Sequence, residues 1–119
     1  MRRTVMPYAD HFEPIEPTRA QVDALREPTV LEFGTEWCGY CQAAAPLIKQ
    51  AFQAHANVRH LKVEDGKGRP LGRSFRVKLW PTLIFIANGT EQERLVRPTD
   101  PDSIESAIAR LMAAHATSA

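Results

Sequence analysis

Hydrophobic residues recur with two different spacings along this chain. Three short runs, at 29–33, 58–64 and 82–87, are rich in apolar and β-branched residues and predict buried strands. Apolar residues at helical spacing follow the first run, from Cys38 to about residue 55, and return near the end of the chain, from about residue 100. The two spacings predict strands and helices that alternate along the chain.

Turn and capping residues add further elements to this pattern. Thr18 can cap a short helix over 18–26, and the segment 65–75 predicts a loop with another short helix. The Asn-Gly pair at 88–89 is a strong hairpin signal, so residues 91–96 are expected to return antiparallel to the preceding strand.

The resulting order of elements is α, β, α, β, α, β, β, α. It predicts an α/β fold with a central mixed sheet of four to five strands and helices on both faces. Residues 1–17 contain three prolines and predict an irregular arm, with a short edge strand near 12–15. One domain over 18–115 and a short tail at 116–119 complete the expected organisation.

Composition narrows the class of function. The chain has 119 residues, 44% apolar and 24% charged, with a formal net charge of +1, so no global charge favours nucleic acid or an anionic membrane. No apolar stretch long enough for a secretory signal or a membrane span is found, and a cytoplasmic location is expected. In that compartment a close cysteine pair is more often catalytic or metal-binding than a structural disulfide.

The only two cysteines lie in the stretch GTEWCGYCQAAAP, where a predicted strand gives way to a helix. The free N–H groups and partial positive charge at a helix N-terminus favour a thiolate at Cys38, which is expected to be exposed enough to attack a disulfide. Cys41, one turn further, is expected to be sheltered and to resolve the mixed disulfide.

A zinc site is an alternative interpretation of the same cysteines. The spacing C-x2-C-x13-H-x4-H, completed by His55 and His60, falls within the zinc-finger range. Against it, His60 belongs to a predicted strand, on whose outward side it is expected, and a helix rather than a hairpin follows the cysteines. Inert thiols are the remaining alternative.

The segment around the cysteines resembles the active-site motif of the thioredoxin family. Trp37, Cys38, Gly39 and Cys41 match the family's Trp-Cys-Gly-Pro-Cys, and Pro46 matches the proline that kinks the helix after it. The stretch WPTLIFIANG at 80–89 resembles the family's cis-Pro-Thr strand. The resemblance runs from about residue 28 to 113.

This resemblance implies dithiol–disulfide exchange on protein substrates, with no bound cofactor or metal. It also implies a monomer that is regenerated by an upstream reductase, a thioredoxin reductase. It makes Pro81 the cis-proline and places a substrate along Trp80, Pro81 and Thr82, close to Trp37 and Gly39. A thioredoxin-fold adaptor that binds one partner without catalysis, or only in one redox state, is the second hypothesis.

The resemblance also implies a buried acid beneath the cysteines, at Glu32, and a partner lysine on the next strand, at Lys62. A carboxylate in an otherwise apolar strand is costly unless it has a partner or a role, and this one could accept and return the Cys41 proton.

The chain departs from the family pattern at four positions. Tyr40 replaces the motif proline, Glu32 is one methylene longer than the usual aspartate, Trp80 is bulkier than usual, and Arg97 stands in place of a glycine. The middle dipeptide of such motifs tunes the redox potential. Trp80 and Arg97 would change the docking surface, so we expect a partner range different from that of a general thioredoxin.

Overall fold

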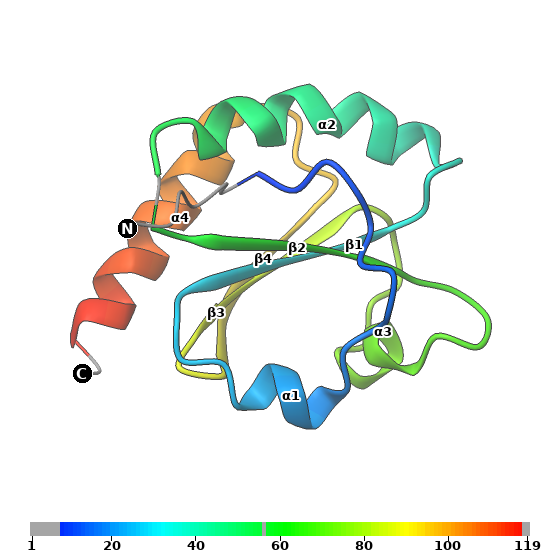
Figure 1. The fold of residues 1–119 in the computed structure, drawn as a ribbon. Coiled ribbons are helices and arrows are strands. Elements are labelled where there is room, and N and C mark those ends of the chain that lie inside the picture. The colour runs from blue at the N-terminus through cyan, green and yellow to red at the C-terminus, as the bar shows by residue number, and fades with distance from the viewer. Residues whose placement is uncertain (1–7, 56, 118–119) are drawn as a thin grey trace, which may run out of the picture.

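The computed structural model describes residues 8–55 and 57–117, in which four strands form one sheet between two layers of helices (Figure 1). The elements in chain order are α1 (Arg19–Asp23), β1 (Thr29–Gly34), α2 (Gly39–Phe52), β2 (Arg59–Glu64), α3 (Pro70–Ser74), β3 (Thr82–Ala87), β4 (Thr90–Val96) and α4 (Pro101–Thr117). The predicted order and the α/β fold class are confirmed. No helix in this part of the chain is long and apolar enough to cross a bilayer.

The sheet has the strand order β2-β1-β3-β4, with β1 parallel to β2 and antiparallel to β3. Side chains alternate between the two faces of β1, so Val30 and Glu32 face α2 and α4 whereas Leu31 and Phe33 face α1 and α3. The opposite placement of Glu32 and its two neighbours was expected from the sequence. Glu32 is therefore a carboxylate on the apolar face that α2 covers.

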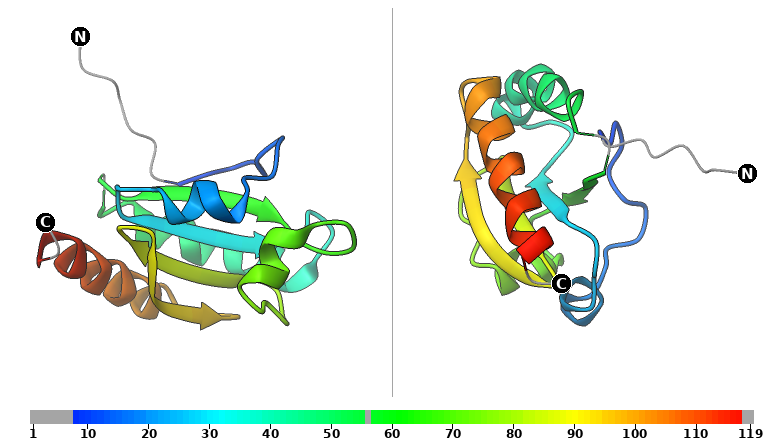
Figure 2. Two further views of the ribbon diagram at one scale, coloured as in Figure 1. Left: turned by 90° about the horizontal axis from the view of Figure 1, so that it is seen from below. Right: turned by 90° about the vertical axis from the view of Figure 1, so that its left-hand side faces the viewer.

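The N-terminal arm runs beside β2, the outer strand of the sheet (Figure 2). The Glu13 N–H donates to the Lys62 carbonyl at 2.8 Å, and Phe12 and Lys62 form an isolated parallel bridge. The expected edge strand near 12–15 is thus reduced to a single bridge, because the chain bends away at residues 14–15, where the ring of Pro14 fixes φ at about −65°.

Helix ends differ from the predicted ends by a few residues. Thr18 caps α1 through a capping box with Gln21, but α1 ends at Asp23 rather than at residue 26. Helix α2 continues through Pro46 and ends at Phe52, three residues earlier than expected. Hydrophobic spacing marks the buried face of a helix better than its last turn.

Candidate redox site

Cys38 lies at the N-terminal end of α2, directly after the loop that leaves β1. It is the N-cap residue, and its Sγ accepts the Cys41 N–H at 3.2 Å. This hydrogen bond and the helix dipole both favour negative charge on the Cys38 sulfur. The structure thus places the N-terminal cysteine where a thiolate is stabilised.

The two cysteines are buried to the same extent, each with 7% of its surface exposed. The expected contrast between an exposed Cys38 and a sheltered Cys41 is therefore wrong. Cys38 turns its sulfur back over the helix end, while its neighbours Trp37 and Tyr40 take the exposed positions at 75% and 60%. The two cysteines differ in hydrogen bonding and in their place on the helix rather than in exposed surface.

Burial first, and then the hydrogen bond with the Cys38 side chain and the nearby charges of Cys38 and Glu32, together raise the pKa of the Cys41 thiol to about 12. A hydrogen bond from the Thr35 backbone opposes this rise. The Cys41 sulfur occupies space that Gly34 leaves open, since a Cβ at Gly34 would lie 2.5 Å from it. Cys41 is thus held as a neutral thiol in a fitted position.

Glu32 is 3% exposed, and its Oε1 lies 2.8 Å from Nε2 of His60. His60 is 5% exposed, so its predicted outward position is wrong. The side of β2 that carries His60 is covered by Phe52 of α2, whose ring stacks on the imidazole at a centroid distance of 4.6 Å. The alternation of apolar and polar residues along β2 could not by itself show that α2 covers this side of the edge strand.

Lys62 is not the hydrogen-bonding partner of Glu32. Its Cα is paired with that of Glu32 in the parallel register, but its Nζ lies over the Phe12 ring, 4.7 Å from the centroid. The arm gives the ammonium an aromatic face, and the longer Glu32 side chain reaches His60 instead. The expected Glu32–Lys62 pair is corrected to a Glu32–His60 pair.

An aromatic surface lies beside the cysteines. Trp37 and Trp80 pack edge to face at a centroid distance of 5.6 Å, and Trp80 donates its Nε1–H to Asp65 Oδ2 at 2.8 Å. The Trp80–Pro81 peptide bond is cis. The structure therefore brings Trp80 and the cis-proline Pro81 to Trp37, the residue directly before Cys38.

Thr82 and Gly39 are the two remaining residues of the expected substrate-binding set. The Thr82 side chain is buried and its hydroxyl donates to the Leu79 carbonyl at 2.6 Å, so this side chain holds the proline loop in shape. Gly39 begins α2 beside open space, with no atom within 4 Å of where a Cβ would stand.

Arg97 joins the proline loop to the motif tyrosine. Its Nε donates to the Trp80 carbonyl at 2.8 Å, and its guanidinium stacks on the Tyr40 ring at 3.7 Å. Arg97 has a φ of 51°, a left-handed conformation that glycine adopts more readily than arginine. A groove of about 300 Å³, lined mostly by apolar atoms of Tyr40, Ala43, Ala44, Leu47, Arg97, Pro98 and Thr99, opens beside this contact.

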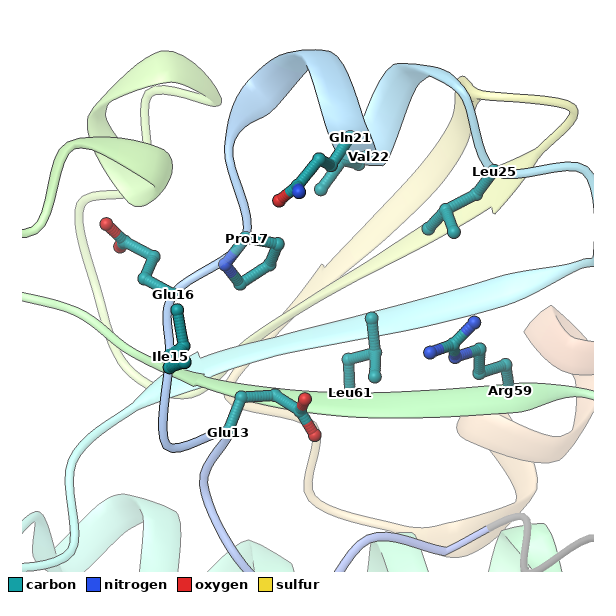
Figure 3. Close-up of a pocket in the computed structure, with 9 residues that line it drawn as sticks. All are labelled: Glu13, Ile15, Glu16, Pro17, Gln21, Val22, Leu25, Arg59 and Leu61. Atoms are coloured by element: carbon teal, nitrogen blue, oxygen red, sulfur yellow. The ribbon is translucent and has the colours of Figure 1, made fainter.

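The four residues of the zinc hypothesis are not brought together. His60 is engaged with Glu32, and His55 lies beyond the far end of α2 from the cysteines. Within residues 8–55 and 57–117, no three metal-ligating side chains gather in one place. A second depression, of about 320 Å³, lies between the arm and α1 and contains no cysteine (Figure 3).

Three residues of the site were missed in the sequence: Gly34, His60 and Asp65. Gly34 ends a buried strand four positions before Cys38, and that place could have suggested a close contact. His60 is two residues from Lys62 in a strand and so shares its face, which was a usable signal for contact with Glu32. No sequence pattern links Asp65 to Trp80.

Comparison with known proteins agrees with this geometry. The sequence model of the family described as Thioredoxin matches residues 16–110. Thioredoxin-1 of Caenorhabditis elegans is 38% identical over 66 residues, which are 56% of this chain and 57% of the relative. Thioredoxin H2-1 of Oryza sativa subsp. japonica is 30% identical over 90 residues, covering 76% of this chain and 64% of its own.

A solved structure covers more of the chain. Thioredoxin 2 from Pseudomonas aeruginosa PAO1 in its reduced form is 48% identical, with a TM-score of 0.73 over 93% of this chain and 96% of that one. The matches to the two curated relatives span about three fifths of those proteins' length. The family match covers most of the chain and includes both cysteines and the proline loop, and the chain belongs to the thioredoxin family.

Proposed function

We propose that this protein is a thiol–disulfide oxidoreductase that reduces protein disulfides through Cys38 and Cys41. The observation that carries the proposal is the asymmetry of the pair. The Cys38 sulfur receives an N–H at a helix N-terminus, whereas burial raises the pKa of Cys41 to about 12. The Cys38 sulfur is thus placed to attack a disulfide as a thiolate, whereas Cys41 stays protonated until the mixed disulfide has formed.

The reaction proceeds in two exchanges. The Cys38 thiolate attacks one sulfur of the substrate disulfide, the substrate S–S bond breaks, and the departing sulfur leaves as a thiolate that takes a proton. Cys41 then loses its proton and attacks the Cys38 sulfur, which releases the second substrate thiol. The substrate gains two electrons and two protons, and the protein is left with a Cys38–Cys41 disulfide.

Glu32 is the proposed acceptor of the Cys41 proton. At pH 7 a thiol with a pKa of about 12 is ionised in only about one molecule in 10⁵. A carboxylate within electrostatic reach of Cys41 supplies a base at the moment of attack. Lys62 is left without a catalytic role in this scheme, since its ammonium contacts Phe12.

The substrate is proposed to dock on the aromatic surface and along the Trp80–Pro81 segment. Arg97 already donates to the Trp80 carbonyl, so an incoming backbone shares that acceptor or displaces the guanidinium. Among the described residues Arg97 makes no ion pair, although its charge lies beside the groove next to Tyr40. We therefore propose that Arg97 favours disulfides flanked by an acidic residue.

A panel of peptide disulfides that differ only in one flanking residue tests this preference. With Glu instead of Gln beside the attacked cysteine, kcat/KM is expected to rise about two- to fivefold, and Arg97→Gln removes the difference. If the ratio of kcat/KM between the Glu and the Gln peptide is the same in Arg97→Gln as in the wild type, Arg97 does not cause the preference for an acidic flank.

A cytoplasmic monomer regenerated by a thioredoxin reductase is the setting we propose. Both cysteines of the chain belong to this pair and none is left for a structural disulfide, which suits a compartment in which thiols are kept reduced. Coupled turnover with NADPH and a thioredoxin reductase tests the regeneration step, and no oxidation of NADPH above the reductase-alone rate would count against it.

Insulin disulfide reduction tests the central proposal. Cys38→Ser is expected to abolish turnover, whereas Cys41→Ser is expected to accumulate a mixed disulfide on Cys38 that mass spectrometry detects. Reduction of insulin by the Cys38→Ser variant at the wild-type rate would overturn the mechanism.

A further inference from the structure

The His60 ring is enclosed by the arm, by α2 and by Glu32. Its side chain has no exposed surface, and it stacks on Phe52 at an interplanar angle of 18°. The Tyr8 ring of the arm lies 5.4 Å from it. Both ring nitrogens of His60 have a partner within hydrogen-bond distance. Nδ1 lies 2.8 Å from the backbone nitrogen of Ala9, and Nε2 lies 2.8 Å from Oε1 of Glu32.

These two partners determine which nitrogen carries the proton. A backbone amide can only donate, so the Ala9 N–H requires a lone pair on Nδ1. A neutral imidazole with a lone pair on Nδ1 carries its proton on Nε2, and this N–H donates to Glu32 Oε1. An imidazolium would place a proton on Nδ1 against the Ala9 N–H, so this arrangement disfavours it.

We propose that His60, held as its neutral Nε2–H tautomer by the Ala9 amide, positions Glu32 to take the Cys41 proton. The inference rests on the proposed role of Glu32. Among the described residues, the only hydrogen bond to the Glu32 carboxylate is the one from His60. It occupies Oε1 and leaves Oε2 to receive a proton.

The groups around the pair are consistent with a charged carboxylate held by a neutral donor. On the arm, burial and then the charge of Glu32 raise the pKa of Tyr8, with a smaller contribution from Asp10. On α2, Phe52 adds no charge and Cys41 keeps its proton, while on β2 the Lys62 ammonium is placed over Phe12. Glu32 thus relies on His60 for orientation rather than on a cation.

The N-terminal arm is therefore part of the proton-transfer site, because its Ala9 N–H donates to His60. The arm is fixed to β2 at Lys62 through Phe12 and Glu13, which keeps the Ala9 N–H aimed at His60. A change at Ala9 should therefore reach the cysteines through the imidazole, without touching them.

Three His60 variants separate the two hydrogen bonds. The amide nitrogen of Gln can replace Nε2 and donate to Glu32, the oxygen of Asn can replace Nδ1 and accept from Ala9, and Phe can do neither. We expect single-turnover resolution of the Cys38 mixed disulfide to slow about tenfold in His60→Asn and His60→Phe and to recover in His60→Gln. His11→Gln, an exposed arm histidine, is the matched control and should equal the wild type.

The first exchange, attack by Cys38, should change less than twofold in all of these variants. A merely structural role of His60 predicts instead that His60→Gln and His60→Asn slow both exchanges alike. If His60→Asn resolves the mixed disulfide at the wild-type rate while Glu32→Gln is slow, the inference fails and the proposed function stands. If Glu32→Gln is also as fast as the wild type, the proposed role of Glu32 fails with it.

The tautomer can be observed directly by ¹⁵N NMR of the imidazole. Wild-type protein is expected to show an unprotonated Nδ1 and a protonated Nε2 at neutral pH, and Ala9→Gly, which keeps the N–H, should show the same. Ala9→Pro, which removes that donor, should lose the single-tautomer pattern. A wild-type ring protonated on Nδ1 would overturn the inference whether or not any His60 variant folds.

Discussion

Cys41 is the residue whose chemistry depends most on its surroundings. Because its pKa is raised to about 12, its thiolate fraction grows about tenfold for each pH unit below that value. In Glu32→Gln the base is lost, so resolution of the mixed disulfide is expected to be slow near pH 7 and to rise about tenfold per unit toward pH 9. The wild type should show a shallower dependence, and quench-flow with alkylation of free thiols measures both profiles.

The same substitution also removes a negative charge that raises the Cys41 pKa, which favours ionisation of Cys41 slightly. That charge is the last of the causes that raise the pKa, after burial and the contacts with Cys38, so the loss of the base should dominate. A Glu32→Gln profile that coincides with the wild type would show that another group accepts the proton.

Gly34 is the second residue whose replacement gives a sharp expectation. An added Cβ would lie 2.5 Å from the Cys41 sulfur, so Gly34→Ala must displace that sulfur. We expect a loss of about 1–3 kcal/mol in unfolding free energy and an accumulation of mixed disulfide with substrate. Gly39→Ala, where a Cβ meets no atom within 4 Å, is the stability control in the same urea titration.

At the scale of elements, the β3–β4 hairpin depends on a contact with the end of α1. A Cβ at Gly89 would meet the backbone carbonyl of Asp23, and Gly89 also has a φ of +77°. Gly68 has nearly the same φ, +80°, but open space around it. The two glycines differ in packing and hardly at all in backbone conformation.

Replacing each with Ala should therefore separate the two costs. Gly68→Ala is expected to lose about 1–2 kcal/mol of stability from the left-handed backbone alone, and Gly89→Ala about 1–3 kcal/mol more from the collision. Thermal and urea unfolding measure both. Equal losses would mean that the hairpin can move away from α1 at no cost.

The order of elements and the sheet could be predicted because each strand and helix has its own hydrophobic spacing. The cysteine pair could be placed because a strand precedes it and a helix follows. The partner of Glu32 could be narrowed to the two residues that share a face of β2, Lys62 and His60, but the choice between them could not be made. The register of β1 on β2 pairs the Cα of Glu32 with Lys62, while the contact is made by His60. That contact depends on Phe52 and on the arm, which carries no regular element.

On the scale of the whole molecule, charge is nearly balanced, with a net value of +1. Long-range steering of substrates should be weak, and any salt dependence should come from local groups such as Arg97. For a peptide disulfide with a neutral flank, kcat/KM should change less than about twofold between roughly 50 and 300 mM salt. For the peptide with an acidic flank, kcat/KM should fall more over the same rise in salt and approach the kcat/KM of the neutral-flank peptide. An equal salt dependence of kcat/KM for the two peptides would contradict this.

The edge-to-face contact of Trp37 and Trp80 has a consequence for spectroscopy. These are the only tryptophans of the chain, and both lie beside the cysteines. Indole emission from this protein therefore comes entirely from its redox site, with no background from the rest of the fold. A thiol, a disulfide or a bound peptide at that site changes the quenching of both rings, so the protein carries its own optical reporter.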